Sequence, residues 1–332
     1  MHCTIPIFIP HLACPFRCVF CNQKHISGTS QLQSMDEIKQ VIERNLATMD
    51  AVDATVEVGF FGGSFTCLPM EQQQQYLEIV QPYLHDARIK GIRLSTRPDF
   101  IDENELQFLK HMQVKTIELG VQSMHEDVLL KSGRGHSAHD VLVASALIKQ
   151  HGFELGLQMM VGLPADTAQK SLATAQKLVE LQPDCVRIYP TLVIQNTQLE
   201  TLFNNGTYIP LALNEAVAVV APILKLFIDN NIPVIRVGLH PSEELEAGGK
   251  LLAGPYHHSF RQLVMTKLWH DELVKIPVSQ HKHITISVAA LQYNYAIGYK
   301  AFNRNYLKQQ FKRVRFVKSD VLTNFSYHVD YC

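Results

Sequence analysis

Hydrophobic positions along this chain alternate between two spacings, and the alternation predicts a repeated strand-then-helix unit. Short apolar or alternating runs, which are typical of strands, are each followed by apolar residues at helical spacing. The expected strands are residues 5–9, 56–60, 89–96, 115–121, 153–161 and 186–189, with residues 232–239 as a seventh candidate. Because strand and helix repeat at short intervals, the pattern predicts a parallel sheet with crossover helices.

Helix starts are marked by side chains that cap free backbone amides. Ser34 and Glu37 have the spacing of a capping box, and Asp102 with Glu105 is placed to begin another helix. Ser137 is the expected cap of a helix that Gly152 ends. Further helices are expected over residues 73–84, 167–181 and 214–230.

The strand and helix rhythm changes after about residue 240. We expect residues 1–240 to form the parallel sheet domain and residues 241–332 to form a smaller α+β extension. Within this extension a strand is expected near residues 285–289 and a helix near residues 295–310. The glycine pair at residues 248–249 and the Gly254-Pro255 step predict turns that precede this strand and this helix.

The extension ends in a basic stretch. Seven cations fall within 19 residues, and those from 312 to 318 are expected to alternate along a strand. One interpretation is a solvated face, and the other is a surface that contacts RNA phosphates. The basic stretch consists of Lys300, Arg304, Lys308, Lys312, Arg313, Arg315 and Lys318.

Aromatic and histidine side chains near the basic stretch have two interpretations. Four aromatic residues could stack on bases, although helical spacing favours a place in the core: Trp269, Tyr293, Tyr295 and Tyr299. Four histidines could bind a metal or phosphate, although histidines on polar loops are more often solvated: His257, His258, His281 and His283.

Composition describes a globular chain with almost no net charge. Its 332 residues are 46% hydrophobic and 18% charged, which is enough to bury a large core. The formal net charge of −1 supplies no global field to attract nucleic acid, so any such attraction must be local. The apolar residues 5–10 are few and have no basic leader, so we expect no signal peptide, no membrane span and a cytoplasmic location.

Three of the seven cysteines stand together in the pattern C-x3-C-x2-C, as Cys14, Cys18 and Cys21. Three thiolates on one loop can hold three irons of an iron–sulfur cluster and leave the fourth iron open. The four-cysteine run of electron carriers and the paired motifs of zinc sites are both incomplete here. The other cysteines are isolated in sequence and are expected to be buried small hydrophobes: Cys3, Cys67, Cys185 and Cys332.

Candidate polar and glycine residues follow the expected strands repeatedly. In parallel sheets and barrels, sites lie at the carboxyl ends of the strands. The segments that follow strands one to six are the cysteine loop, Gly62-Gly63-Ser64, Ser95 to Asp99, Gln122, Gly162-Leu163-Pro164 and Tyr189-Pro190. We therefore expect these segments to converge on one site.

With these residues in place, the chain resembles the radical S-adenosylmethionine (radical SAM) enzymes, whose signature is C-x3-C-x2-C. The resemblance implies a partial (β/α)6 parallel barrel and a [4Fe–4S] cluster held by Cys14, Cys18 and Cys21. It implies that the open iron chelates SAM and that the reduced cluster cleaves it to a 5′-deoxyadenosyl radical. That radical then abstracts a hydrogen atom from the substrate.

The resemblance also implies a set of SAM contacts. Gly62 and Gly63 match a glycine pair that lets backbone groups approach the methionine end, and the Arg134 fork suits a carboxylate. Ser64, Ser95 and Gln158 stand where relatives often carry other residues. The implied contacts are Phe20, Gly62, Gly63, Ser64, Ser95, Gln122, Arg134 and Gln158; no substrate-contacting catalytic residue is assigned.

Four segments further resemble the radical SAM part of the Elongator catalytic family, which acts on wobble uridine of tRNA: residues 93–99, 118–123, 187–194 and 254–258. This resemblance covers about residues 1–265. Two departures are the different cysteine spacing and the lack of room in 332 residues for that family's acetyltransferase domain. The resemblance implies tRNA or another RNA as substrate, docked on the basic stretch, and a reductase or flavodoxin-type electron donor.

Two alternatives remain open. One is radical chemistry on a small or porphyrin-like molecule, as in oxygen-independent coproporphyrinogen oxidase. The other is a non-catalytic iron–sulfur or haem-binding protein. A carrier would have no need for Gly62-Gly63, Gln122 and Arg134 in register with the cysteine loop, so these residues favour an enzyme.

Overall fold

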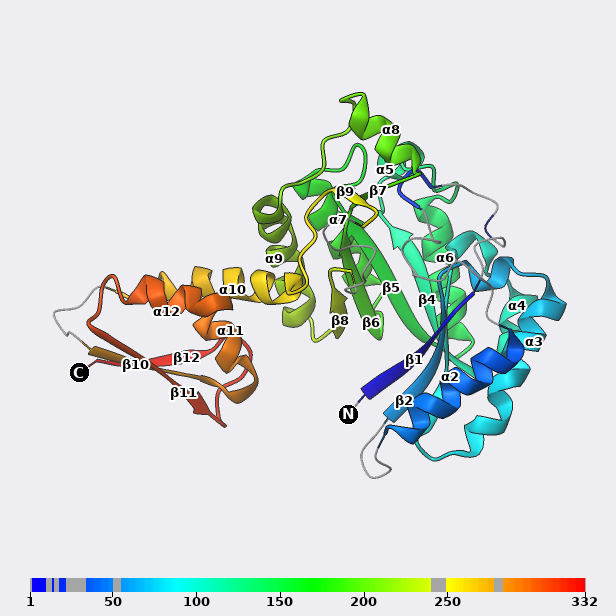
Figure 1. Ribbon diagram of the computed structural model, residues 1–332, viewed down its shortest axis with the longest axis horizontal. Coiled ribbons are helices and arrows are strands. Elements are labelled where there is room, and N and C mark those ends of the chain that lie inside the picture. Colours follow the sequence, from blue (N-terminus) through cyan, green and yellow to red (C-terminus); the bar gives the residue numbers. More distant parts are fainter. Residues whose placement is uncertain are drawn as a thin grey trace.

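The computed structural model describes residues 2–9, 14, 18–21, 34–49, 55–239, 249–277 and 283–331. Its centre is a seven-stranded sheet in the order β1-β2-β3-β4-β5-β6-β8, with every neighbouring pair parallel (Figure 1). The expectation of a partial parallel barrel is confirmed. The strands are β1 (His2–Phe8), β2 (Thr55–Phe61), β3 (Ile89–Thr96), β4 (Val114–Gln122), β5 (Glu154–Val161), β6 (Cys185–Pro190) and β8 (Val234–Val237).

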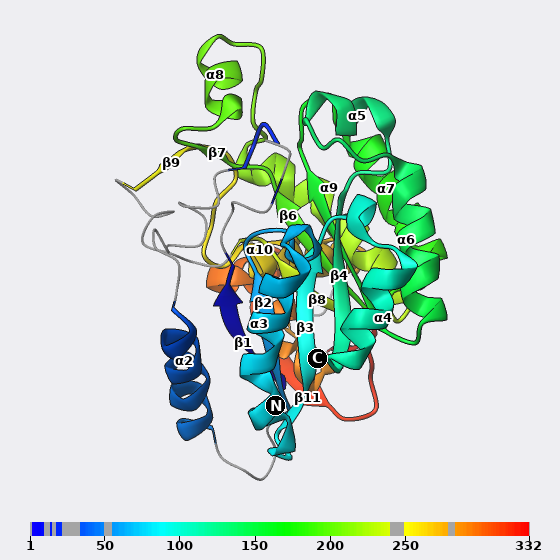
Figure 2. The same ribbon diagram turned by 90° about the vertical axis from the view of Figure 1, so that its right-hand side faces the viewer.

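Helices cover the convex face of this curved sheet, and the main core lies between the two layers (Figure 2). Apolar residues of the strands, such as Ile92 and Leu94, pack against apolar residues of the helices, such as Leu106 and Ile148. These helices are α2 (Met35–Ala47), α3 (Met70–Val80), α4 (Glu103–His111), α6 (Ala138–Gln150), α7 (Ala168–Glu180) and α9 (Leu213–Asp229).

The expected caps are present at the starts of these helices. Ser34 and Glu37 form a capping box, and the Asp102 carboxylate accepts the Glu105 amide at 2.8 Å. The helix expected over residues 73–84 instead begins at Met70 and gives way to the 3-10 helix η3 (Gln81–His85). The reason is Pro82, which lacks the amide hydrogen that an α-helix would use there. None of the described helices is long and apolar enough to cross a membrane.

Smaller elements cap the carboxyl edge of the sheet. Helix α5 (Glu126–Lys131) follows β4, and α8 (Gln198–Asn204) follows the short strand β7 (Val193–Ile194), which pairs with β9 (Leu251–Ala253). The sequence pattern did not predict β7 or β9, which are too short for an alternation to be recognised. It predicted a strand over residues 232–239, where β8 covers only Val234–Val237.

The described part of residues 260–331 forms what we call the C-terminal arm, which extends from the barrel (Figure 1). Its sheet has the order β11-β10-β12, with β11 parallel and β12 antiparallel to β10. Helices on one face enclose a second core around the fully buried Trp269. The elements are α10 (Phe260–Leu273), β10 (His283–Ala289), α11 (Tyr293–Ile297), α12 (Phe302–Leu307), β11 (Arg313–Ser319) and β12 (Tyr327–Tyr331).

Helix α10 joins the two cores. Its Phe260 and Leu268 belong to the main core, whereas Trp269 and Leu273 belong to the arm's core. The boundary expected between residues 240 and 241 lies outside the described residues, as do Gly248, His281 and Cys332, and the division into domains stays a prediction.

The single helix expected over residues 295–310 is wrong. The chain leaves the helix at Gly298, which has φ +87°, and Lys300 and Ala301 adopt left-handed conformations. Thr266 of α10 holds residues 299–303 by two hydrogen bonds. Its hydroxyl accepts the Tyr299 amide at 2.8 Å, and its carbonyl accepts the Asn303 side-chain amide at 3.1 Å. Tertiary hydrogen bonds therefore replace the helical ones that the spacing predicted.

Candidate cofactor site at the carboxyl ends of the strands

The segments expected to converge do follow strands whose carboxyl ends lie along one edge of the sheet (Figure 1). At the first pair, Phe8 lies opposite Phe61, and the Ile9 amide donates to the Phe61 carbonyl at 2.8 Å. The cysteine loop after β1 therefore starts directly beside the glycine pair after β2.

The described part of the cysteine loop is anchored by residues distant in sequence. The Val19 amide donates to the Ser132 carbonyl at 3.0 Å, and the Val19 carbonyl accepts the Leu199 amide at 2.7 Å. Val19 is buried in a small apolar cluster with Leu199, against which Phe20 packs. The Cys21 amide donates to the Cys18 carbonyl at 3.0 Å, so these two cysteines share one tight turn.

Two guanidinium groups lie near the cysteines. Arg134 Nη1 donates to Cys18 Sγ at 3.3 Å. Burial disfavours the charged form of Arg97, but its hydrogen bond with Asp99 and the nearby Asp99, Cys14 and Cys18 raise its pKa overall. Two guanidinium groups therefore lie beside the described part of the cysteine loop.

The three cysteines are not gathered as a ligand set in this structure. Among the described residues, no group of three or more His, Cys, Asp or Glu side chains is placed to hold a metal ion. Cys67 lies near Cys14, and burial, followed by the charge of Cys14, raises the pKa of Cys67 to about 12. Cys67 is therefore a protonated thiol, while the assignment of Cys14, Cys18 and Cys21 as ligands stays a prediction.

The end of β4 brings together three of the residues singled out in the sequence. Gln122 has a left-handed backbone with φ +65°, and its Oε1 accepts Gln158 Nε2 at 3.2 Å. Arg134 Nη2 donates to the Gly120 carbonyl at 2.6 Å. A Cβ at Gly120 would lie 2.9 Å from Gln122 Nε2 and 3.3 Å from Arg134 Nη2, so only glycine leaves this space open.

His136 also lies at the end of β4, and the sequence analysis did not identify it. Its Nε2 lies 3.2 Å from the Val121 carbonyl, and burial, followed by the charges of Arg134 and Arg97, lowers its pKa to about 3. A neutral ring that donates from Nε2 leaves Nδ1 as an acceptor. His136 Nδ1 and Arg134 Nε are buried without a hydrogen-bond partner among the described residues. The only signal was its place two residues after Arg134.

The loops after β2 and β3 are tied to each other. Gly62 has φ +101°, and a Cβ there would lie 3.1 Å from the Ile9 carbonyl, so the turn beside the cysteine loop requires glycine. Gly63 is half-buried and Ser64 is buried next to it. Thr66 and Thr96 share a 2.6 Å hydrogen bond between the two loops.

Ser95 is half-buried and lies opposite Glu118 across the β3–β4 ladder. The structure therefore places Ser95 beside Glu118, a buried carboxylate on the concave face.

A network of buried charges lines the concave face of the sheet, and the sequence analysis did not identify it. Arg93 donates to Glu57 Oε2 at 2.9 Å and to Glu118 Oε1 at 2.8 Å. Arg187 donates to both oxygens of Glu118, at 2.5 and 2.9 Å. Burial would raise the pKa of Glu118, but the two guanidinium groups lower it overall, with Arg187 the stronger. The only sequence signal was single charges within apolar strands.

The concave face differs from the packed interior of a closed barrel. Arg187 lies 3.5 Å from the hydroxyl of half-buried Tyr189 and 5.3 Å from the Phe61 ring centroid. Two carboxylates and two guanidinium groups balance in charge, so the network fixes side-chain positions without attracting a counterion. The charge network can therefore hold in place the polar side chains at the carboxyl ends of these strands.

Two family models match consecutive parts of the chain. The model of the Radical SAM superfamily matches residues 8–178, and the model of the radical SAM C-terminal domain matches residues 183–270. The first match covers the cysteine loop and five of the seven parallel strands in whole or in part. The arm beyond residue 270 lies outside both matches.

Similar proteins include tRNA uridine(34) acetyltransferase from Dehalococcoides mccartyi, which is 24% identical over 309 residues, or 81% of this chain and 67% of that protein. Elongator complex protein 3 from Homo sapiens is 30% identical over 195 residues, or 52% of this chain and 35% of that protein. The chain therefore spans about two thirds of the first relative and about a third of the second.

Among solved structures, the archaeal Elp3 of Methanocaldococcus infernus with an N-terminal deletion has a similar fold. The TM-score is 0.65 at 18% sequence identity, and the match covers 90% of this chain and 68% of that chain. At this identity the likeness establishes the fold alone.

Proposed function

We propose that this chain, which belongs to the radical SAM superfamily and is a radical SAM enzyme, modifies tRNA. The observation that carries the tRNA assignment is the match over most of the chain to a protein named for uridine 34 of tRNA. The match extends beyond the segments that hold the cysteine loop and the strand ends. A tRNA substrate also agrees with a cytoplasmic location.

Membership of the superfamily implies a [4Fe–4S] cluster and SAM, and the residues present fit both in chemical kind. Cys14, Cys18 and Cys21 offer three thiols from one loop, and the Arg134 guanidinium donates to Cys18 Sγ. When bound, the cluster and SAM supply reductive cleavage to a 5′-deoxyadenosyl radical that removes a hydrogen atom from the substrate. A reductase or flavodoxin-type protein would supply the electron.

Polar atoms of the strand ends would hold SAM beside the cysteine loop. Arg134 is fixed by the Gly120 carbonyl, and its unpartnered Nε suits a carboxylate. Gln122 and Gln158 are joined by a hydrogen bond, so the two amides present one fixed pair of polar groups. The remaining proposed contacts with SAM are Phe20 for the adenine, Gly62 and Gly63 for the methionine end, and Ser64 and Ser95 as hydroxyl donors.

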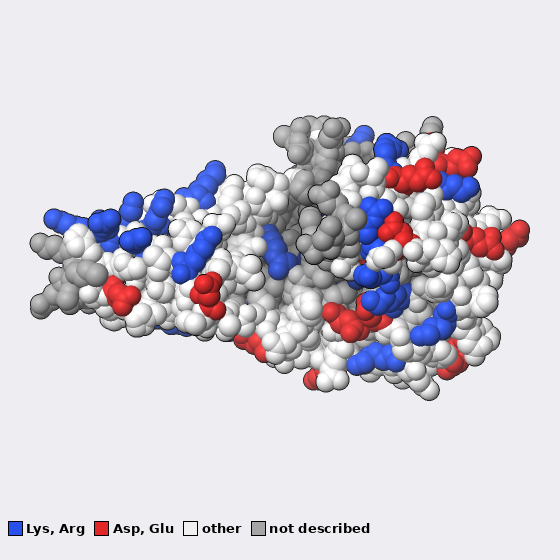
Figure 3. Space-filling view, turned by 90° about the horizontal axis from the view of Figure 1, so that it is seen from below, with Lys and Arg blue, Asp and Glu red and all other residues white. Residues whose placement is uncertain are grey.

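The basic stretch would dock the tRNA. Six of its seven cations are exposed, Arg304 is half-buried, and none of the seven forms an ion pair with a described residue. Figure 3 shows lysine and arginine side chains gathered on the arm. Because no described carboxylate pairs with these cations, they are available to phosphates.

The cations of β11 do not all share one face of its sheet. Arg313 and Arg315 alternate with buried Val314 and Phe316 and lie on the face without helices. Lys318 belongs to the other face, and its Nζ lies 5.5 Å from the Tyr293 ring centroid. The proposed docking surface therefore wraps around β11.

The proposal is tested by measuring 5′-deoxyadenosine formed by the anaerobically reconstituted, dithionite-reduced protein. Bulk tRNA is expected to stimulate formation, and a small-molecule cell extract is not. Stimulation by the small-molecule extract alone would contradict the tRNA assignment and favour chemistry on a small or porphyrin-like molecule.

The matched control for this assay is a pair of cysteine variants. Cys18→Ala is expected to abolish 5′-deoxyadenosine formation, because a proposed cluster ligand is lost. Cys3→Ala is expected to retain it, because Cys3 is half-buried near the opposite end of β1. Equal activity of the two variants would contradict the role of the cysteine loop.

A further inference from the structure

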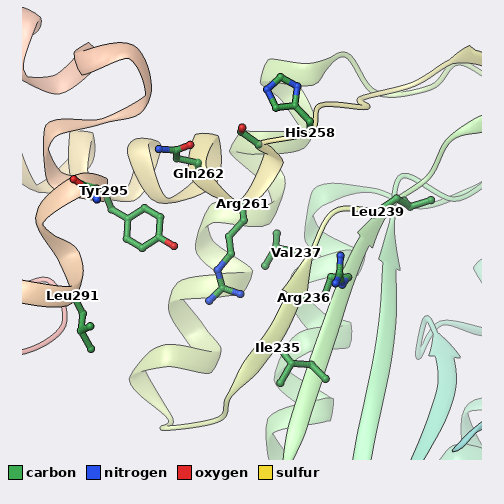
Figure 4. Close-up of a pocket in the computed structure, with 11 residues that line it drawn as sticks. Ile235, Arg236, Val237, Leu239, His258, Arg261, Gln262, Leu291 and Tyr295 are labelled. Atoms are coloured by element: carbon green, nitrogen blue, oxygen red, sulfur yellow. The ribbon is translucent and has the colours of Figure 1, made fainter. Parts of the chain in front are cut away.

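A groove of about 480 Å³ lies between edge strand β8 and the arm (Figure 4). Leu239 and His258 lie at one end of it, and Ile235 and Leu291 lie at the other. Leu239 follows the carboxyl end of β8, so that end of the groove belongs to the same edge of the sheet as the cysteine loop. Its volume is within the range of small-ligand sites.

The charged side chains among the described residues that line the groove are all cationic. The described lining includes Arg236 and Arg261 but no aspartate or glutamate. Arg261 reaches from α10 toward β8, where its Nη1 donates to the Val234 carbonyl at 2.6 Å (Figure 4). The guanidinium of half-buried Arg236 forms no hydrogen bond or ion pair with the described residues. A half-buried guanidinium group suits an external anion.

The groove also offers apolar and aromatic surface. Leu291 is 90% exposed and Ile235 is 41% exposed. Tyr295 of α11 presents its ring toward the same space, and Gln262 and Asn294 add amide groups (Figure 4). Aromatic rings with arginine planes and amides are the groups that recognise unstacked bases of single-stranded RNA.

A continuous row of side chains links the groove to the basic stretch. Lys300 Nζ lies 5.5 Å from the Tyr299 ring centroid, and that ring meets His257 edge-on at 5.4 Å. His257 in turn stacks on His258, which lines the groove, at 4.5 Å. Burial, followed by the charges of His258 and Lys300, lowers the pKa of His257.

We infer that this groove binds one phosphate–base unit of single-stranded RNA, with Arg236 and Arg261 on the phosphate and Tyr295 against the base. The inference rests on the proposed function and locates a contact for its tRNA substrate outside the cofactor site. The row from Lys300 to His258 places this contact at the end of the basic stretch. An acidic peptide would satisfy the arginines but would not supply the aromatic base that stacks on the Tyr295 ring.

The test compares two arginine variants in binding fluorescein-labelled bulk tRNA to the full chain. Arg236→Gln is expected to weaken binding about tenfold and to reduce the salt slope by about 1, because one phosphate contact is lost. Arg44→Gln is the matched control, since Arg44 is exposed on α2 and also has no partner among the described residues. It is expected to weaken binding by less than about twofold.

A second pair of variants tests the base contact with a short single-stranded oligoribonucleotide. Tyr295→Leu is expected to weaken binding by about fivefold or more, whereas Tyr295→Phe retains the ring and is expected to retain binding. Circular dichroism confirms that each variant is folded. Equal loss in both variants would overturn the stacking role.

The remaining outcomes separate this inference from the proposed function. If wild type binds tRNA and Arg236→Gln binds it as well as Arg44→Gln does, the inference that the groove binds RNA is overturned and the proposal that tRNA is the substrate stands. If wild type binds no tRNA, both are overturned. If polyglutamate binds wild type but not Arg236→Gln, and Arg236→Gln binds tRNA as well as wild type does, the groove accepts acidic peptides and the RNA assignment is overturned.

Discussion

Charged side chains on the concave face of the barrel and on the C-terminal arm have opposite surroundings. On the concave face, Glu118 is 3% exposed and is hydrogen-bonded to both Arg93 and Arg187. On the arm, Arg313 and Arg315 are exposed and form no ion pair with a described residue. One region satisfies its charges internally, and the other leaves them to the solvent.

This difference indicates what each region can do. A buried charge is tolerated only with partners, so a buried network holds side chains in one arrangement. An exposed cation contributes little to stability but can release counterions when it meets a phosphate. The concave face is therefore suited to positioning groups within the chain, and the arm is suited to binding a separate polyanion.

Removing the central carboxylate should produce the largest change in stability. We expect Glu118→Gln to lower the free energy of unfolding by about 3–5 kcal/mol, because it leaves two buried guanidinium groups without their counter-charge. Chemical denaturation followed by circular dichroism measures this change. Glu180→Gln, which alters an exposed carboxylate that no described side chain contacts by a hydrogen bond or ion pair, should change it by less than about 0.5 kcal/mol.

The pH dependence sharpens this prediction. The pKa of Glu118 is lowered in the folded chain from its ordinary value of 4.5, chiefly by Arg187 against the opposing effect of burial. Its contribution is therefore present above about pH 4.5 and is lost as the pH falls through the folded pKa. The difference between wild type and Glu118→Gln should shrink on acidification, and a constant difference would contradict the paired charge.

The contribution of Glu105 to stability should depend on pH in the opposite direction to that of Glu118. Glu105 is buried, its Oε1 has no partner among the described residues, and burial raises its pKa to about 7. The folded chain then retains a proton that the unfolded chain loses, so stability falls as the pH rises from about 4.5 to about 7.

We therefore expect Glu105→Gln to stabilise the chain at a pH of about 8, by up to about 3 kcal/mol, and to have little effect near a pH of about 4.5. Denaturation at both pH values measures this difference, with Glu180→Gln as the control again. Destabilisation at the higher pH would show that the carboxylate is paired in a way that this structure does not contain.

The arm should give the smallest change in stability. We expect Arg313→Gln with Arg315→Gln to change the free energy of unfolding by less than about 0.5 kcal/mol. The double variant should nonetheless weaken binding of bulk tRNA and lower its salt slope by about 2. Arg44→Gln serves as the charge control on the barrel. A large loss of stability with unchanged tRNA binding would contradict the comparison.

Local signals in the sequence predicted much of the fold. The residues 89–96 were expected as a strand and are β3 (Ile89–Thr96). Ser34 with Glu37 and Asp102 with Glu105 were expected as caps, and both are present. Capping and periodicity involve residues close in sequence, which is why they could be recognised there.

Contacts between distant residues could not be predicted in the same way. Glu118 of β4 meets Arg93 of β3 and Arg187 of β6, and His136 meets Val121 only because the loop before α6 folds back onto β4. The helix expected over residues 295–310 failed for the same reason, since Thr266 of α10 holds its middle. Pairings of this kind depend on register and packing, which no local spacing specifies.

The amino-acid sequence by itself determined the order of the strands and helices of the main sheet, the caps, the three-cysteine motif and the composition of the basic stretch. Only the tertiary structure decided that Gln122, Arg134 and Gln158 meet, that the concave face carries paired charges, and that Arg236 and Arg261 share a groove with Tyr295. The physical reason is the sequence separation over which each kind of interaction acts. Backbone propensity acts within a few residues, whereas hydrogen bonds between distant side chains depend on the packing of the whole chain.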